Sequence, residues 1–363
     1  MNKELLTKIA NDNNTVGVCS LIADKNGIKD IYCYGKRSVE KNLDITPNSI
    51  FRIASVSKII VALAALMLHD EGKMNIYEDI SKYLGYLVRN PHYPNHIITT
   101  EMLMTQTSSI NDGEHETLGY DGVNGKHFYV SLEKLLTDPN YEYYLDRTFM
   151  NVKPGSTFCY SNFGCGILAC IVEKVSGMYF TDYIKEKLLD KMNLDASFRA
   201  SEIKNKDLIA SLYRNDGSLS ISGERFIETT YPKHPLGDNF RGPAGGLFIS
   251  PVDLTKIMQM LMNNGTYENH IYLSKKMMLD MKDIHWKTLC PDGMYKQKGL
   301  QLMITDDYKY RLYGHLGNAY GLRSYMLFTD DIGYIFICNG ANFKLIKDDI
   351  STMQEDFLFE MMK

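Results

Sequence analysis

A serine and a lysine three residues apart, Ser55 and Lys58, stand directly before an apolar run at residues 59–68. Residues at i and i+3 share one face of a helix, so the hydroxyl and the amine would lie close together. A serine hydroxyl becomes a nucleophile only when a base takes its proton, and burial lowers a lysine pKa toward that role. The pair therefore predicts nucleophilic catalysis. The alternative interpretation is that Ser55 is an ordinary helix cap.

A second group of interest is the triplet Tyr160-Ser161-Asn162, which follows a Pro154-Gly155 turn and precedes another apolar helix. A tyrosine beside a lysine ammonium ionises more easily and can act as a general base. The amide of Asn162 can orient both the lysine and a substrate carbonyl. Taken alone, Tyr160 is better explained as a buried core tyrosine without a catalytic role.

The third group is the only H-x-G triplet of the chain, which begins at His315. We expect it at the end of a strand, where the backbone N–H of Asn318 would join that of Ser55 in binding an oxyanion. Gly317 would let a substrate approach the backbone. His315 would attract an anionic substrate group, so Michaelis constants for acidic substrates should fall toward pH 6. The alternative is a turn histidine without a role.

The helices and strands that must position these groups lie in two regions with different hydrophobic patterns. The chain begins with two strand candidates joined at Asn26-Gly27, and four more lie between residues 300 and 340, before a terminal amphipathic helix. The middle reads mainly as helices and loops. The pattern predicts one α+β catalytic domain of two lobes, with the site in the cleft between them. The predicted lobes are a sheet lobe at about 1–65 and 290–363 and a mostly helical lobe at about 66–289.

Composition excludes several classes of partner. The 363 residues are 44% hydrophobic and carry a net charge of −4, so there is no basic excess to bind nucleic acid. No apolar run reaches the roughly 20 residues that span a bilayer. The N-terminus lacks the apolar segment of a signal peptide, which predicts a cytoplasmic protein unless a signal has been removed. A small-molecule substrate is the remaining expectation, and the oligomeric state stays open.

In this order, the three motifs resemble those of the serine β-lactamase and penicillin-binding protein superfamily. The chain is most similar to its class C β-lactamase branch, with the related D-peptidases and esterases. The similarity covers most of the chain from Phe51 onward, including EGKMNIYEDISKYL, ITTEMLMTQTSSI and GPAGGLFISPVDL. It implies a five-stranded antiparallel sheet covered by helices, an inserted helical lobe, and an acyl-enzyme mechanism on a peptide, ester or β-lactam. It implies neither a metal nor an organic cofactor.

The resemblance also implies a role for each residue. Ser55 would attack a carbonyl while Lys58 and Tyr160 move its proton. The remaining implied residues bind the substrate or the oxyanion: Asn162, His315, Gly317 and Asn318.

Two departures from the family pattern shape the functional prediction. The third motif usually starts with lysine followed by threonine, whereas this chain has His315 and Leu316. A mostly neutral imidazole without a neighbouring hydroxyl favours a D-peptidase or esterase over an efficient β-lactamase. Gln106 and Ser109 stand where the family has histidine and glycine, so that loop is expected to have a different shape. The alternative function is a penicillin-binding or sensing protein without turnover.

Overall fold

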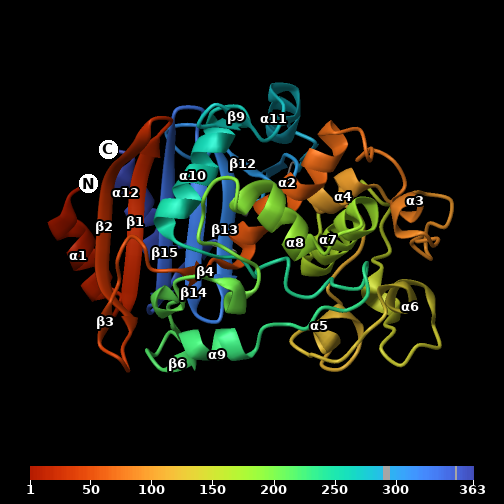
Figure 1. Ribbon diagram of the computed structural model, residues 1–363, viewed down its shortest axis with the longest axis horizontal. Coiled ribbons are helices and arrows are strands. Elements are labelled where there is room, and N and C mark those ends of the chain that lie inside the picture. Colours follow the sequence, from red (N-terminus) through yellow and green to blue (C-terminus); the bar gives the residue numbers. More distant parts are fainter. Residues whose placement is uncertain (289–294, 348–349) are drawn as a thin grey trace.

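The computed structural model describes residues 1–288, 295–347 and 350–363. Within them, nine strands form one antiparallel sheet in the order β10-β11-β12-β13-β14-β15-β1-β2-β3 (Figure 1). The strands are β1 Gly17–Asp24, β2 Gly27–Ser38, β3 Leu43–Asp44, β10 Trp286–Lys287, β11 Gln297–Lys298, β12 Met303–Thr305, β13 Leu312–Ala319, β14 Leu322–Phe328 and β15 Ile332–Gly340. The predicted number of five strands is therefore wrong. Five long strands form the centre, and short strands at both edges extend it.

Both ends of the chain contribute strands to the sheet, as the strand-like patterns near the two termini predict. Strand β1 lies between β2 and β15, with Ser20 opposite Tyr32 on one side and Phe336 on the other. Successive residues of β1 point to opposite faces, so Cys19 joins one buried apolar cluster and Val18 joins the other. The sheet is accordingly covered on both faces.

Helices from distant parts of the chain supply these covers. Helix α10 (Pro251–Met262) packs on β1 and β15 from one side, while α1 (Lys3–Asp12) and α12 (Thr352–Met361) cover the opposite face. Helix α10 begins as its sequence indicates, because Ser250 Oγ accepts a hydrogen bond from the backbone N–H of Asp253 and a proline follows the cap. Although α10 lies in the range assigned to the helical lobe, it packs on the sheet. The predicted boundary at residue 290 falls outside the described residues, and the division into lobes stays a prediction.

The helical part is built around α2 (Ser57–Asp70) and α7 (Asn162–Ser176), which pack against each other beside the sheet (Figure 1). Helix α2 is buried at every position from 57 to 68, so it is a core helix and not a surface one. Three helices pack directly on this pair: α3 Ile80–Leu84, α4 Thr100–Thr105 and α8 Phe180–Ile184. The other described helices are α5 Gly119–Val123, α6 Leu132–Thr137, α9 Gly223–Glu228 and α11 Lys275–Lys282.

Four two-stranded pairings complete the described part of the chain. They are β4 Phe51–Arg52 with β7 Phe248–Ile249, β5 Leu212–Tyr213 with β6 Leu219–Ile221, β8 Thr266–Tyr267 with β9 His270–Ile271, and β16 Leu345–Lys347 with β17 Ile350–Ser351. No single described helix has the length and apolar character to cross a membrane. Only the bent pair 162–176 and 180–189, counted together, meets those two criteria.

Candidate active site

Ser55 lies in a short 3₁₀ turn, Ala54–Val56, that leads into α2. Ala54 has a φ of 52°, a left-handed conformation that non-glycine residues seldom adopt. The side chain of Ser55 accepts hydrogen bonds from two other side chains and caps no backbone N–H of α2. The alternative prediction, an ordinary helix cap, is therefore wrong.

Lys58 is fully buried in the first turn of α2 and uses all three of its donors. Its ammonium donates to Ser55 Oγ at 2.9 Å, to Asn162 Oδ1 at 2.8 Å and to the carbonyl oxygen of Ala244 at 2.8 Å. None of these acceptors carries a charge. The positive charge of Lys58 is thus held beside Ser55 without a neutralising carboxylate.

Tyr160 reaches the same hydroxyl from another part of the chain. Its Oη donates to Ser55 Oγ at 2.7 Å, and Lys58 Nζ lies 4.9 Å from the centre of its ring. The Lys58 ammonium therefore lies near the face of the phenol whose hydroxyl contacts Ser55. The structure thus brings the hydroxyl, the ammonium and the phenol together, which is the geometry required for the predicted roles.

Asp112 anchors the second motif, and sequence reasoning missed it. Its carboxylate accepts hydrogen bonds from Ser161 Oγ at 2.9 Å, from Asn162 Nδ2 at 2.7 Å and from the backbone N–H groups of Asn162 and Phe163 at the start of α7. Because the amide nitrogen of Asn162 faces this carboxylate, its oxygen faces Lys58. No local spacing signals this contact, since Asp112 precedes Asn162 by 50 residues.

Gln106 and Ser109 lie in the loop that follows α4, and its difference from the family loop stays a prediction. Both residues have left-handed φ angles, 63° and 66°. The Oε1 of Gln106 accepts a hydrogen bond from the backbone N–H of Ser161 at 2.6 Å, and Ser109 Oγ accepts one from Asn90 Nδ2 at 2.8 Å. Gln106 therefore helps to hold the second motif in place.

The third motif was predicted to lie at the end of a strand, but the structure places it inside strand β13. His315 is fully buried and its Nδ1–H donates to the carbonyl of Leu316 at 2.6 Å. Burial, together with the charges of Lys298 and Lys58, holds the pKa of His315 well below its ordinary value. The imidazole is therefore neutral and points away from solvent. This placement does not supply the predicted attraction for anionic substrates near pH 6.

Gly317 was predicted to let a substrate approach the backbone, but the structure requires a glycine here because a side chain would collide with neighbouring atoms. A Cβ atom at this position would lie 2.2 Å from Ser324 Oγ and 2.6 Å from the carbonyl oxygen of Ile53. The glycine thus lets β13 lie directly against the turn that carries Ser55. The neighbouring Asn318 is exposed and lines the same cavity as Ser55. Its backbone N–H as an oxyanion donor stays a prediction.

A second buried lysine lies beside these groups. Lys298, on β11, is fully buried, and its ammonium has no hydrogen-bond partner in the described part of the chain. Its Nζ lies 5.5 Å from the centre of the Tyr295 ring. Burial, aided by the charge of Lys58, lowers the pKa of Lys298 from 10.5 to about 7. The polar segment MYKQKGL reads as surface, so the sequence gives no sign of this burial.

The front of the site opens into a cavity of about 280 Å³. It is lined by Arg52, Ala54, Ser55, Tyr120, Asn124, Asn162, Tyr231, Gly242, Ala244, Gly245, Asn318, Ala319 and Tyr320. Tyr160 and His315, whose ring centres are 6.2 Å apart, do not line this cavity. The described residues contain no group of three or more histidine, cysteine, aspartate or glutamate side chains arranged to hold a metal ion.

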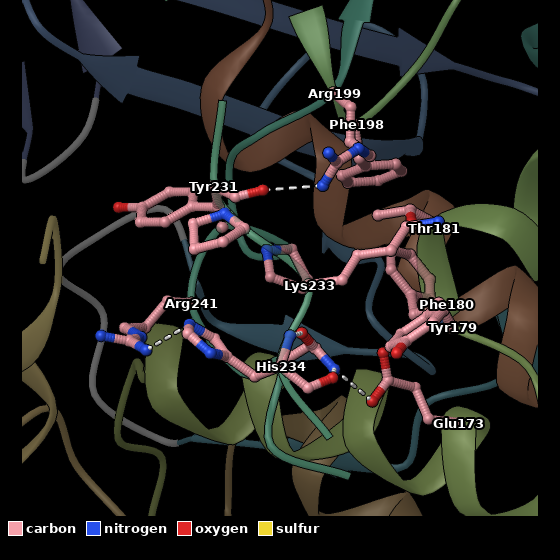
Figure 2. Close-up of a pocket in the computed structure, with 14 residues that line it drawn as sticks. Glu173, Tyr179, Phe180, Thr181, Phe198, Arg199, Tyr231, Lys233, His234 and Arg241 are labelled. Atoms are coloured by element: carbon pink, nitrogen blue, oxygen red, sulfur yellow. Dashed lines mark hydrogen bonds between the residues drawn. The ribbon is translucent and has the colours of Figure 1, made fainter. Parts of the chain in front are cut away.

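A separate pocket with about 50 Å³ of free space lies between α7, α8 and the 229–243 loop (Figure 2). Its charged groups are satisfied within the protein. Glu173 accepts hydrogen bonds from Asn239 Nδ2 and two backbone N–H groups, and Arg241 donates to backbone carbonyls and to His234. Figure 2 shows the bonds from Glu173 and Arg241 to these side chains. These contacts fix the segment that brings Tyr231 to the Ser55 cavity.

Comparison with known proteins gives consistent matches. The family model described as Beta-lactamase matches residues 4–349. Protein flp of Staphylococcus aureus (strain N315) is 30% identical over 190 residues, which are 52% of this chain and 36% of that protein. The putative penicillin-binding protein PbpX of Bacillus subtilis (strain 168) is 26% identical over 242 residues, 66% of this chain and 52% of its own length. The chain therefore spans about a third to a half of these relatives.

Solved structures share the fold over nearly the whole chain. D-amino acid amidase from Ochrobactrum anthropi SV3, complexed with L-phenylalanine amide, gives a TM-score of 0.75 at 19% identity over 99% of this chain and 97% of that one. The octameric penicillin-binding protein homologue from Pyrococcus abyssi gives 0.72 at 21% identity, with 99% and 78% covered. At these identities the similarity establishes the fold alone.

Proposed function

Since the chain belongs to the Beta-lactamase family, we propose that it is a serine hydrolase that forms an acyl-enzyme on Ser55 with an amide, ester or β-lactam. The observation that carries this proposal is the convergence of two donors on one hydroxyl. Lys58 Nζ and Tyr160 Oη lie 2.9 and 2.7 Å from Ser55 Oγ. A hydroxyl with a titratable partner at hydrogen-bonding distance is the arrangement that nucleophilic catalysis requires.

In the proposed first step, Tyr160 acts as a phenolate and takes the proton of Ser55 as Oγ attacks the carbonyl carbon. The ammonium of Lys58, 4.9 Å from the ring of Tyr160, stabilises that phenolate. Lys58 keeps its three hydrogen bonds in this step and so continues to hold Ser55 and Asn162 in position. General base catalysis of this kind contributes about 10²- to 10⁴-fold in rate.

The developing oxyanion would be held by the backbone N–H groups of Ser55 and Asn318. The close packing of β13 on the turn before α2, which Gly317 permits, supports this assignment. Tyr160 then gives its proton to the leaving nitrogen or oxygen. A water molecule then replaces the leaving group, and the phenolate takes its proton as the water oxygen attacks the acyl carbon. The bond to Ser55 Oγ breaks, Tyr160 returns that proton to Oγ, and the acid is released.

Among possible substrates, we propose D-amino acid amides, D-peptides and short esters over β-lactams. Two observations support this order. The position of the family's motif lysine is taken by a buried, neutral His315, and Leu316 offers no hydroxyl. In addition, one of the solved structures with this fold is a D-amino acid amidase. The same departures favour the alternative, a protein that is acylated or binds penicillin without turnover.

A panel of D-amino acid amides, p-nitrophenyl esters and nitrocefin separates these two functions. The hydrolase should turn over at least one class, and Ser55→Ala should abolish that turnover. A binding protein would give a lasting adduct or reversible binding without product. If the purified protein and the Ser55→Ala variant behave identically on every substrate, the proposed function is wrong.

A further inference from the structure

Two cavities adjoin at the mouth of the site. The cavity of Ser55 shares Arg52, Tyr231, Gly242 and Tyr320 with a neighbouring cavity of about 360 Å³. Aromatic side chains contribute much of the wall of the second cavity: Phe198, Phe226, Phe248, Tyr231 and Tyr320. Together the two spaces offer room for an acyl group much larger than acetyl.

Arg52 has an unusual position between these cavities. It lies on β4, three residues before Ser55, and is partly buried with its guanidinium 4.9 Å from the centre of the Tyr320 ring. In the described chain no carboxylate pairs with it, and no oxygen accepts a hydrogen bond from its side chain. Several other arginines do pair with a carboxylate, including Arg89 with Asp79, Arg199 with Glu202 and Arg311 with Asp306.

The surroundings of Arg52 leave its charge without compensation. Neither cavity has an aspartate or glutamate among its described lining residues. A guanidinium has five N–H donors in a planar fork that matches a carboxylate. In a partly desolvated wall, such unmatched donors favour an anionic ligand with two parallel hydrogen bonds.

The mechanism indicates which half of the substrate meets Arg52. Tyr160, which returns the proton to the leaving group, lies against Tyr295 and His315 and does not line the cavity of Arg52. The leaving group therefore departs on the side of Tyr160. The half that remains bound to Ser55 faces Arg52, Tyr231 and Tyr320.

We propose that Arg52 binds a carboxylate on the acyl half of the substrate, beside an aromatic or apolar group of that same half. This inference rests on the proposed acyl-enzyme function and specifies its substrate class. Arg52 is then a specificity residue, because it contacts the acyl group and not the reacting atoms.

Three esters with matched shapes test the proposal. The first, p-nitrophenyl 4-carboxyphenylacetate, carries the anion on the acyl half, and the second, p-nitrophenyl 4-methylphenylacetate, is its neutral counterpart. The third, 3-carboxy-4-nitrophenyl 4-methylphenylacetate, carries the anion on the leaving group. Each is measured with the wild-type protein, Arg52→Gln, Arg52→Lys and the control Arg311→Gln. The control removes the same formal charge from a half-exposed arginine that pairs with Asp306.

We expect Arg52→Gln to lower kcat/KM for the acyl-carboxylate ester by about tenfold or more, the usual effect of losing a charged hydrogen bond. Arg52→Lys keeps a charge but loses the fork, so its loss should be smaller. The other two esters should change by less than about threefold, as should every ester with Arg311→Gln.

Two results would overturn the assignment while the hydrolase function stands: an equal loss for all three esters, or a selective loss for the ester with the anionic leaving group. If the wild-type protein neither turns over nor is acylated by any ester, the proposed function itself fails, and this inference fails with it. Thermal unfolding of each variant identifies losses that come from misfolding.

Discussion

Replacing Lys298 by methionine should stabilise the protein, because this lysine is buried and no described residue accepts a hydrogen bond from it. Its ammonium is inaccessible to solvent and donates no hydrogen bond in the described part of the chain. Methionine has a similar length and no charge, so it fills the same space without the cost of desolvation. A buried polar group that costs stability is expected where function requires it, and Lys298 lies beside Lys58 and His315.

The magnitude and its pH dependence follow from the pKa of Lys298. Burial lowers this pKa to about 7, while the unfolded chain keeps the ordinary value near 10.5. Below pH 7 both states bind the proton, and the folded state carries the full cost of the buried charge. As the pH rises from 7 toward 10.5, the folded lysine is neutral and the cost declines. The wild-type protein should therefore be destabilised by about 4 to 5 kcal/mol at pH 6 and by about 2 kcal/mol at pH 9.

Urea unfolding of the wild-type protein and Lys298→Met at pH 6 and pH 9 measures this difference. The variant should be more stable at both values, and its advantage should shrink at pH 9. Lys282→Met is the control, because Lys282 is also buried but pairs with Asp330 at 2.7 Å. That variant should have equal or lower stability. If Lys298→Met is less stable than the wild-type protein at pH 6, the buried charge of Lys298 does not destabilise the folded state as proposed.

Three further substitutions probe the site. Tyr160→Phe should lower kcat by about 10²- to 10⁴-fold without loss of folding, since only the proton-transfer group is removed; an unchanged kcat would exclude Tyr160 as the base. Asp112→Asn should lower the free energy of unfolding by roughly 1.5–3 kcal/mol, and kcat as well, because the anchor of Asn162 is weakened; urea unfolding and steady-state kinetics measure both, and full activity would show that Asn162 needs no anchor. Gly317→Ala should cost about 1–3 kcal/mol of stability through overpacking and should reduce acylation of Ser55; wild-type stability and rate would contradict the close packing of β13.

Much of the site was predictable from the sequence because its parts are encoded locally. The spacing of Ser55 and Lys58 at the start of an apolar helix predicts that they share a face. In the structure the ammonium of Lys58 donates a hydrogen bond to Ser55 Oγ. The strands at both ends of the chain were identified by their alternating and apolar texture. The two-residue strands at the sheet edges carry too few residues to show any period, so the total of nine strands was not predictable.

The remainder depends on contacts between distant segments. Nothing near His315 in sequence shows that β13 lies in the middle of the sheet, where burial and two lysines keep the imidazole neutral. Lys298 lies in a polar segment, and it is buried where β11 pairs with β10 on one side and with β12 on the other. Asp112 meets Asn162 across 50 residues. Such positions are set by tertiary packing, which a single sequence does not encode in any local period.

In the proposed mechanism Ser55 becomes acylated, and intact-mass spectrometry detects this adduct. The protein is mixed with an activated ester or a fluorescent penicillin, quenched in acid within seconds, and its mass and its labelled peptide are determined. We expect one acyl group per chain, carried by the peptide that contains Ser55, and none in Ser55→Ala. Labelling of equal extent in Ser55→Ala, or an adduct on another residue of the wild-type protein, would contradict it.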